Sequence, residues 1–220
     1  MKIIAHIETD FDSKFGIPRQ SGIVPQLIGR IVFEPEYRVP EAFRGLDGFS
    51  HIWLVWDFSE CHQESWSPTV RPPRLGGNQR VGVFATRSPF RPNPIGLSCV
   101  EIDHIDLQTP DGPVIWVKGA DLMNGTPIFD IKPYISFADC KPEAKAGFTQ
   151  QTLQQPELIV VFSDEVKALF KADKLESLRA VLAQDPRPHY QTDESRVYGM
   201  LFAGKDLHFE VKGDEIRVFC

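Results

Sequence analysis

Hydrophobic positions in the first 137 residues fall in short runs that have strand periodicity and little helical period. The runs are rich in valine, isoleucine and aromatic residues and are bounded by glycine, proline or aspartate, a pattern typical of β-strands. The predicted strands cover residues 3–8, 29–33, 50–58, 81–86, 97–105, 114–119 and 128–135. Short strands separated by turn signals predict a barrel or a sandwich.

The predicted strand 50–58 is apolar on both of its faces. Ile52 and Leu54 fall on one face, and Trp53 and Val55 on the other. A strand with two apolar faces is typical of a central position that is covered on both sides.

The pattern changes in the last third of the chain. Residues 141–156 are polar and predict a connection. Beyond them, helical spacing runs from Val166 to Leu182 after Ser163, a residue type that favours the N-cap position. Strands are predicted at 158–162, 197–203, 207–211 and 216–220. The sequence therefore predicts a mainly β protein, with an N-terminal β-barrel at 1–140, a connection at 141–156 and a small α+β domain at 157–220.

Composition narrows the class of protein. The chain has 220 residues, of which 42% are hydrophobic and 25% charged, as in ordinary globular proteins. No apolar run approaches the roughly 20 residues that span a bilayer, and residues 1–8 do not resemble a signal peptide. We therefore expect a cytoplasmic protein without a membrane segment.

The cysteines predict free thiols. Cys61, Cys99, Cys140 and Cys220 lie far apart and form no Cys-x-x-Cys pair, so the sequence indicates neither a disulfide framework nor a zinc knuckle. His51, Cys61 and His62 match no ligand spacing that we know for a metal. We expect no metal.

Charge is segregated along the chain. Residues 65–100 contain five arginines, six prolines and no aspartate or glutamate, whereas without these arginines 19 basic residues face 30 acidic ones. An acidic protein with one basic segment can attract a phosphate-bearing partner locally. The prolines fix φ and order the backbone that displays the arginines. The alternative is a solvated loop whose arginines pair with the surplus acids.

Two further stretches carry candidate chemistry. Residues 119–134 place polar side chains around an Asn-Gly turn, which predicts either a ligand grip or an ordinary hairpin turn. Residues 14–22 form a basic, glycine-containing loop that fits a ligand loop or a plain connection equally well. The chain has no P-loop, Rossmann fingerprint, or serine or cysteine nucleophile motif.

Together these segments resemble the TsaA-like family of S-adenosylmethionine-dependent methyltransferases that act on a modified adenosine in tRNA. The segments 82–98 and 130–134 are the most specific of the matching motifs. The resemblance is carried by residues 15–20, 44–53, 69–78, 82–98, 121–134 and 185–190. It implies a TsaA-like β-barrel that binds the cofactor without a Rossmann fold, a small C-terminal domain, and a homodimer.

The resemblance also implies a cofactor site. Position 124 departs from the family, which often has aspartate where this chain has Asn124, and an amide keeps a hydrogen bond but not a negative charge. The S-adenosylmethionine-binding residues implied are Pro18, Arg19, Gln20, His62, Gln63, Arg87, Leu97, Asp121, Leu122, Met123 and Asn124.

The implied reaction transfers a methyl group to N6 of threonylcarbamoyladenosine, next to the anticodon of tRNA. Alignment of the reactants supplies much of the acceleration in such a displacement, which needs neither a covalent nucleophile nor a metal. No catalytic residue is assigned. The candidates for RNA phosphates or the threonyl carboxylate are Arg71, Arg74, Arg80, Arg91 and Lys132. The alternatives are a related methyltransferase with a small-molecule substrate and a non-catalytic RNA-binding module.

Overall fold

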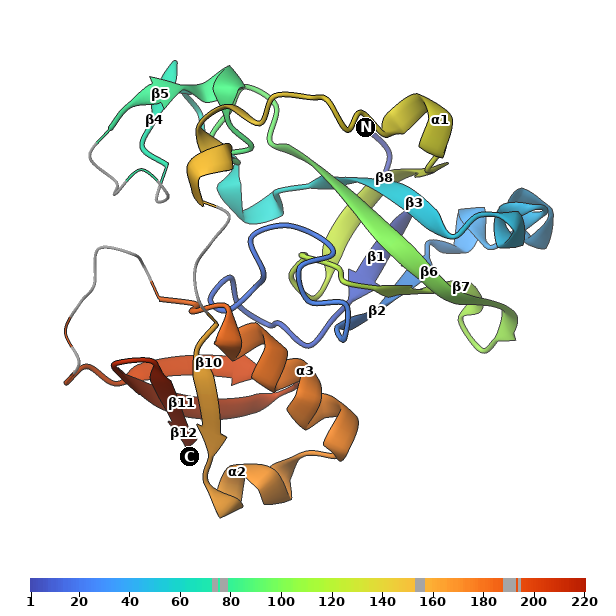
Figure 1. Cartoon of the computed structure of the whole chain (residues 1–220). Helices are drawn as coiled ribbons and strands as arrows, with labels where there is room; N and C mark the ends of the chain where they lie inside the picture. Colours follow the sequence, from blue (N-terminus) through green and yellow to red (C-terminus); the bar gives the residue numbers. More distant parts are fainter. Residues whose placement is uncertain (73–74, 76–78, 153–156, 188–192, 194) are drawn as a thin grey trace.

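The computed structural model describes residues 1–72, 75, 79–152, 157–187, 193 and 195–220. Six strands close into a barrel in the order β1-β2-β7-β6-β3-β8 (Figure 1). These strands are β1 (Ala5–Glu8), β2 (Ile28–Phe33), β3 (His51–Asp57), β6 (Ile95–Thr109), β7 (Gly112–Lys118) and β8 (Thr126–Pro133). The barrel, rather than the sandwich, is therefore the correct reading of the strand pattern.

Alternating side chains fill the barrel. In β3, Ile52 and Leu54 are fully buried, whereas Trp53 between them is half-buried. Neighbouring strands supply the same kind of residue, with Ile31, Ile115 and Ile128 also fully buried. β3 pairs with β6 on one side and β8 on the other, as expected of a central strand.

The prediction of a strand over 81–86 is wrong. β5 (Val81–Gly82) is short and pairs with β4 (Thr69–Val70) in a two-stranded ribbon outside the barrel. The chain then turns into a 3-10 helix at Val83–Ala85, because Thr86 donates to the Val83 carbonyl from both its amide, at 3.1 Å, and its hydroxyl, at 2.8 Å. An apolar run that ends in a residue able to hydrogen-bond to the nearby backbone is compatible with either a strand or a turn.

The C-terminal residues form a second sheet in the order β10-β11-β12-β9, with two helices (Figure 1). The Ser163 hydroxyl accepts a hydrogen bond from the Val166 amide at 3.3 Å and caps the first helix, as predicted. The elements are β9 (Ile159–Phe162), α2 (Asp164–Leu169), α3 (Ala172–Ala183), β10 (Tyr198–Phe202), β11 (Lys205–Lys212) and β12 (Glu215–Phe219). Fold class is thus as predicted: a barrel with a small α+β domain.

The remaining helices are short. Along the chain, two of them follow the barrel and precede the C-terminal sheet: α1 (Ser136–Asp139) and the 3-10 helix Gly147–Thr152. The other 3-10 helices are Pro35–Tyr37, Pro40–Phe43, Leu46–Gly48 and Ser59–Cys61. Among the described residues, none of the helices is long and apolar enough to cross a membrane.

The segment between β1 and β2 joins the two parts of the molecule (Figure 1). Phe11 belongs to the hydrophobic cluster of the C-terminal domain and packs edge-on against Phe202, with ring centroids 5.6 Å apart. The Ala203 amide donates to the Asp10 carbonyl at 2.8 Å, and Lys174 Nζ lies 2.7 Å from Asp10 Oδ1. The C-terminal domain therefore holds this segment in place.

Candidate functional site

A cavity of about 700 Å³ lies at one end of the barrel. Its walls come from four stretches that are distant in the sequence: the loop after β1, the end of β3, the segment leading into β6, and the stretch before β8. In residue numbers these are 14–20, 56–61, 86–97 and 121–126, of which not every member reaches the cavity. A volume of this size is ordinary for a small-molecule site.

The floor of the cavity is a buried polar chain. Trp56 Nε1 donates to Ser98 Oγ at 3.0 Å, and Ser98 Oγ donates to Asp121 Oδ1 at 2.6 Å. Gly96 pairs with Trp56 across β3 and β6, and a Cβ at position 96 would lie 2.1 Å from the indole ring. Only glycine leaves room for the indole here, so the ring and the carboxylate behind it are fixed before any ligand binds.

Burial disfavours the charged form of Asp121. Removal from water raises the pKa of this carboxyl above its usual 3.8, against the Ser98 hydrogen bond, backbone amides and the positive charge of Arg87, all of which lower it. The carboxylate thus carries an energetic cost that a cationic ligand group in the cavity would relieve.

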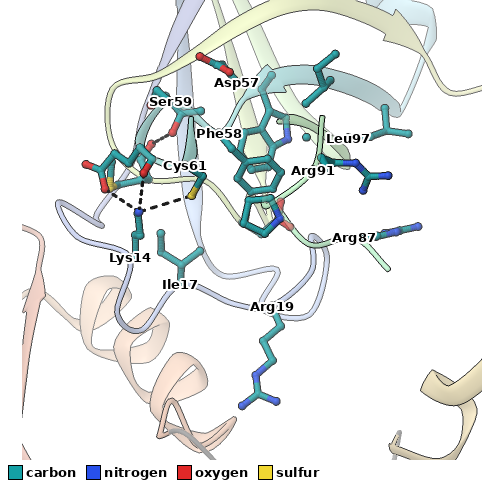
Figure 2. Close-up of a pocket in the computed structure, with 18 of the residues that line it drawn as sticks. Lys14, Ile17, Arg19, Asp57, Phe58, Ser59, Cys61, Arg87, Arg91 and Leu97 are labelled. Atoms are coloured by element: carbon teal, nitrogen blue, oxygen red, sulfur yellow. Dashed lines mark hydrogen bonds and ion pairs between the residues drawn. The ribbon is translucent and has the colours of Figure 1, made fainter. Parts of the chain in front are cut away.

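Two arginines form one side of the cavity. The Arg87 guanidinium donates to the side-chain carbonyl of Gln20, which ties the segment before β6 to the loop after β1. Arg91 Nη1 donates to the Thr86 carbonyl at 3.2 Å. Figure 2 shows both guanidinium groups on the same side of the site, with Arg19 pointing away from them. This side can hold an anionic group such as a carboxylate.

The opposite side carries a lysine, carboxylates and a thiol. Lys14 Nζ lies 3.2 Å from Glu60 Oε2 and 3.7 Å from Cys61 Sγ (Figure 2). His62 Nε2 lies 2.8 Å from Asp57 Oδ1. The Lys14 contacts join the loop after β1 to the segment after β3, whereas the His62 contact joins that segment to the end of β3. Carboxylate oxygens therefore lie beside the cavity.

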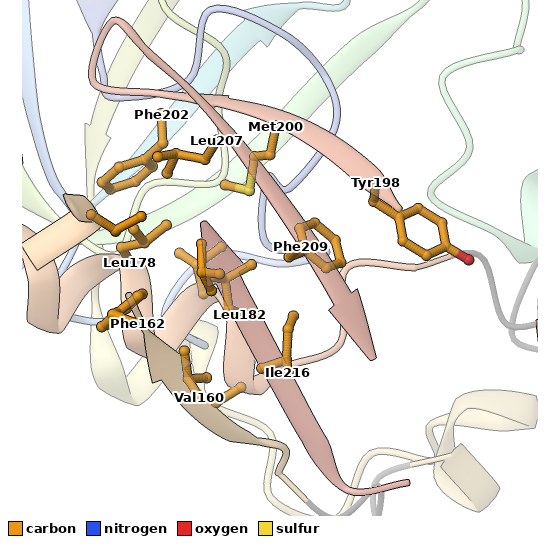
Figure 3. Close-up of a cluster of buried hydrophobic side chains, with 14 of the residues drawn as sticks. Val160, Phe162, Leu178, Leu182, Tyr198, Met200, Phe202, Leu207, Phe209 and Ile216 are labelled. Carbon is orange, nitrogen blue, oxygen red and sulfur yellow. The ribbon is translucent and has the colours of Figure 1, made fainter. Parts of the chain in front are cut away.

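The C-terminal domain packs against the loop after β1, which forms one wall of the cavity. Phe15 stacks on Tyr198 and Phe209, which belong to the C-terminal core drawn in Figure 3, at centroid distances of 6.5 and 6.1 Å. Gly16 has a φ of +89°, and a Cβ there would lie 2.6 Å from the end of the Met200 side chain. A contact between the domains therefore fixes the position of residues 17–20.

The structure brings most of the predicted cofactor residues together. His62 and Gln63 are exposed next to the cavity, and His62 reaches it through Asp57. Leu122 is buried in the barrel core. The predicted residues that line the cavity are Pro18, Arg19, Gln20, Arg87, Leu97, Asp121 and Met123.

Asn124 lies outside the cavity and hydrogen-bonds to the loop after β1. The Asn124 side chain accepts from the Thr9 amide at 3.2 Å and donates to Asp12 Oδ1 at 3.0 Å. Its own amide donates to the Phe11 carbonyl at 2.7 Å. An aspartate here would face Asp12 with a second negative charge, so the amide suits its surroundings in this chain.

The candidates for RNA contact fall in three places. Arg71 and Arg80 are exposed on or beside the β4–β5 ribbon, and Arg80 Nη1 donates to Thr69 Oγ1 at 2.9 Å. Arg91 lines the cavity instead. Lys132 is on β8 and pairs with Asp130 at 3.1 Å. Arg74 lies outside the described residues.

Sequence reasoning missed several residues of the cavity. Trp56, Asp57 and Glu60 line the cavity and are not among the residues that the sequence analysis named. One signal was available: the apolar pattern of β3 ends abruptly in acidic residues. Polar residues that follow a buried strand mark the end of a barrel, where sites are commonly built.

The chemistry of these side chains fits S-adenosylmethionine. Its sulfonium and ammonium groups suit the carboxylates of Asp121, Asp57 and Glu60, and its carboxylate suits Arg87 or Arg91. The indole of Trp56 and the apolar Leu97 suit a purine ring. Within the described parts of the chain, no three histidine, cysteine, aspartate or glutamate side chains group to hold a metal ion.

Comparison with known proteins identifies the family of the chain. Residues 6–140 match the family model of the tRNA-methyltransferase O N-terminal domain, and residues 155–220 match that of the TrmO C-terminal domain. A tRNA (adenine(37)-N6)-methyltransferase of Escherichia coli is 44% identical, over 99% of this chain and 95% of the relative. A protein of Pseudomonas aeruginosa named a putative S-adenosylmethionine-dependent methyltransferase is 37% identical, over 98% of this chain and 94% of the relative.

A solved structure shows the same architecture. The crystal structure of TrmO from Pseudomonas aeruginosa superposes with a TM-score of 0.76 and 32% identity, covering 99% of this chain and 93% of that one. Both family models match in order along the chain, and the relatives match nearly from end to end. The chain therefore belongs to the tRNA-methyltransferase O family.

Proposed function

We propose that this protein is an S-adenosylmethionine-dependent methyltransferase that methylates N6 of threonylcarbamoyladenosine at position 37 of tRNA, beside the anticodon. One observation carries the proposal. The segment that supplies Arg87, Arg91 and Leu97 to the cavity continues directly from the ribbon that displays Arg80. A single acid-free stretch of chain thus serves both a small-molecule cavity and an exposed basic surface.

The donor would be held by the cavity. S-adenosylmethionine supplies an electrophilic methyl group when it is bound. Asp121 would face its positive end, and Arg87 would hold its carboxylate with Gln20 as support. Because Trp56, Ser98 and Asp121 are already hydrogen-bonded to one another, little ordering is needed when the donor enters. The proposed cofactor residues remain those implied by the sequence: Pro18, Arg19, Gln20, His62, Gln63, Arg87, Leu97, Asp121, Leu122, Met123 and Asn124.

The acceptor would be held by the basic segment. Guanidinium groups bind phosphates and carboxylates in a bidentate way, so Arg71, Arg80 and Arg91 suit the anticodon-loop backbone and the threonyl carboxylate. The base next to the anticodon lies in a single-stranded loop, where RNA is most accessible to protein side chains. Positioning of the two reactants is then the main contribution of the protein to the rate.

The division of labour follows the two domains. We propose that residues 1–140 bind the cofactor, that residues 141–156 connect the domains, and that residues 157–220 support the loop after β1. The contacts of Phe15 and Gly16 with the C-terminal core are consistent with this role. The protein is further proposed to act as a homodimer, as its resemblance to the family implies, and to act in the cytoplasm.

The test is methylation of a defined tRNA. Purified protein is mixed with labelled S-adenosylmethionine and tRNA that carries threonylcarbamoyladenosine, and the nucleosides are analysed by mass spectrometry. We expect one added methyl group on the modified adenosine and none on the same tRNA without the threonylcarbamoyl group. Absence of methylation, with cofactor binding intact and a related enzyme active in parallel, would contradict the proposal and favour a small-molecule substrate.

A further inference from the structure

Two aromatic rings lie exposed on the ribbon side of the molecule. Trp66 is 49% exposed and Phe84 is 74% exposed. Their ring centroids are 6.0 Å apart, with an angle of 33° between the ring planes. A pair of large exposed aromatic side chains is a common mark of an interaction surface.

The backbone beneath this pair is held firmly. β4 and β5 pair through Thr69 with Gly82, and the Val83 amide donates to the Pro68 carbonyl at 2.9 Å. The Val83 side chain is buried, so the 3-10 turn at Val83–Ala85 directs the next residue, Phe84, outward. The exposure of the rings is therefore built into the local fold.

The stretch of chain that carries the pair is basic. Both rings belong to the stretch 65–100, which contains no acidic residue. Arg80 is anchored on Thr69 of the ribbon, at 2.9 Å. Exposed aromatic rings beside arginines match the way in which proteins bind single-stranded RNA, with bases stacked on the rings and phosphates on the cations.

The pair is also close to the cavity along the chain. Phe84 precedes Thr86 by two residues and Arg87 by three, and both of these line the cavity. Two residues of extended chain span at most about 7 Å, the size of one nucleotide step. A base stacked on Phe84 would therefore belong to the same loop as the base that enters the cavity.

A second copy of the chain fits this surface less well. In a twofold dimer the same patch meets itself, so an interface centred on Trp66 and Phe84 would bring two acid-free arginine segments together. RNA instead supplies the opposite charge.

Resting on the proposed function, we infer that Trp66 and Phe84 form a stacking platform for an unpaired base of the anticodon loop adjacent to the methylated adenosine, while Arg80 binds a neighbouring phosphate. The platform would hold the loop open beside the cavity. It is a site of substrate recognition and takes no part in the chemistry.

The platform can be tested by binding of tRNA that carries threonylcarbamoyladenosine, measured by fluorescence anisotropy. Phe84→Ala and Trp66→Ala should each weaken binding by roughly 5- to 100-fold, the range found for loss of one stacked base. Phe84→Tyr keeps an aromatic face and should bind almost normally, whereas Phe84→Leu should fail like alanine. Phe137→Ala is the matched control, because Phe137 is 88% exposed on α1, outside the acid-free segment.

Two further readouts separate the possible outcomes. S-adenosylmethionine affinity should be unchanged in all of these variants, which shows that they are folded. If wild-type protein binds and methylates tRNA but Phe84→Ala and Trp66→Ala bind it equally well, the platform is overturned and the proposed function stands. If the alanine variants dissociate a dimer without a direct loss of tRNA affinity, the pair is a protein interface and the inference is also wrong. If wild-type protein neither binds nor methylates tRNA, the proposed function itself fails.

Discussion

The floor of the cavity and the β4–β5 ribbon belong to neighbouring stretches of chain but are built in opposite ways. On the floor, Trp56 and Ser98 are buried and hydrogen-bonded to each other, and Ser98 is hydrogen-bonded to Asp121. On or beside the ribbon, Phe84, Arg71 and Arg80 face solvent. The floor has one shape that a small ligand must fit, whereas the ribbon offers separate exposed groups to a large, charged partner. Burial, more than residue type, therefore separates the proposed donor site from the proposed acceptor site.

The comparison can be tested most strongly with a pair of glycines. Gly96→Ala would place a Cβ 2.1 Å from the ring of Trp56, so the indole must move and its bond to Ser98 must break. We expect a loss of about 1–3 kcal/mol of folding free energy, measured by chemical denaturation, together with loss of cofactor binding. Gly82→Ala on the ribbon is the control, because a Cβ there meets no atom within 4 Å. Equal tolerance at both positions would show that the floor is not rigid.

A pair of arginines gives the next largest effect. Arg87→Ala removes a charge from the cavity and its link to Gln20, so S-adenosylmethionine affinity should fall by roughly 10- to 100-fold, as for a hydrogen bond to a charged group. Arg80→Ala, on the ribbon, should leave that affinity unchanged. Isothermal titration calorimetry provides the measurement. Equal losses in the two variants would remove the distinction between cavity and ribbon.

The carboxyl of Asp121 in the floor should make the stability of the protein depend on pH. Because burial raises the pKa of Asp121, its contribution to stability is full below the usual 3.8 and is lost as pH rises through the raised value. Asp121→Asn keeps an acceptor for Ser98 and removes the charge, so it should stabilise the protein at neutral pH by about 0.5–2 kcal/mol.

That gain should disappear as pH falls through the raised pKa of Asp121 toward the usual 3.8, because the wild-type carboxyl then takes up its proton. Urea denaturation of both proteins across this range tests the sign. Cofactor affinity should fall in the same variant, since the charge that costs stability is the one proposed to face the cationic end of the donor. A pH-independent difference in stability would contradict the assignment.

The smallest effect expected is a change of salt dependence. Affinity for tRNA should fall by about 0.7 log units per log unit of salt for each phosphate contact, whereas affinity for the small donor should change little. Arg80→Ala should reduce the slope for tRNA by about one contact. A flat response to salt would argue against phosphate binding by the ribbon.

The barrel was largely predictable from the sequence, because alternation in strands such as β3 is a local property that each segment shows by itself. The cap at Ser163 and the C-terminal meander were predictable for the same reason. The short length of the strand that begins at Val81 was not predictable, because the hydrogen bonds of Thr86 decide whether an apolar run continues as a strand or turns.

The cavity was only partly predictable. Arg87 and Asp121 were named from the family resemblance, but their meeting with Trp56 depends on strand register and barrel closure. No local sequence pattern indicates that Trp56 pairs with Gly96 on the neighbouring strand. The role of the C-terminal domain beneath Gly16 was likewise invisible, since it arises from contact with Met200, far along the chain.

The central claim is that one acid-free segment serves a donor cavity and an acceptor surface that can be disabled separately. The direct test measures dissociation constants for both S-adenosylmethionine and modified tRNA in Arg87→Ala and in Phe84→Ala. We predict that Arg87→Ala weakens the cofactor and spares tRNA, and that Phe84→Ala weakens tRNA and spares the cofactor. Parallel loss of both ligands in each variant, or loss of neither, would contradict the account.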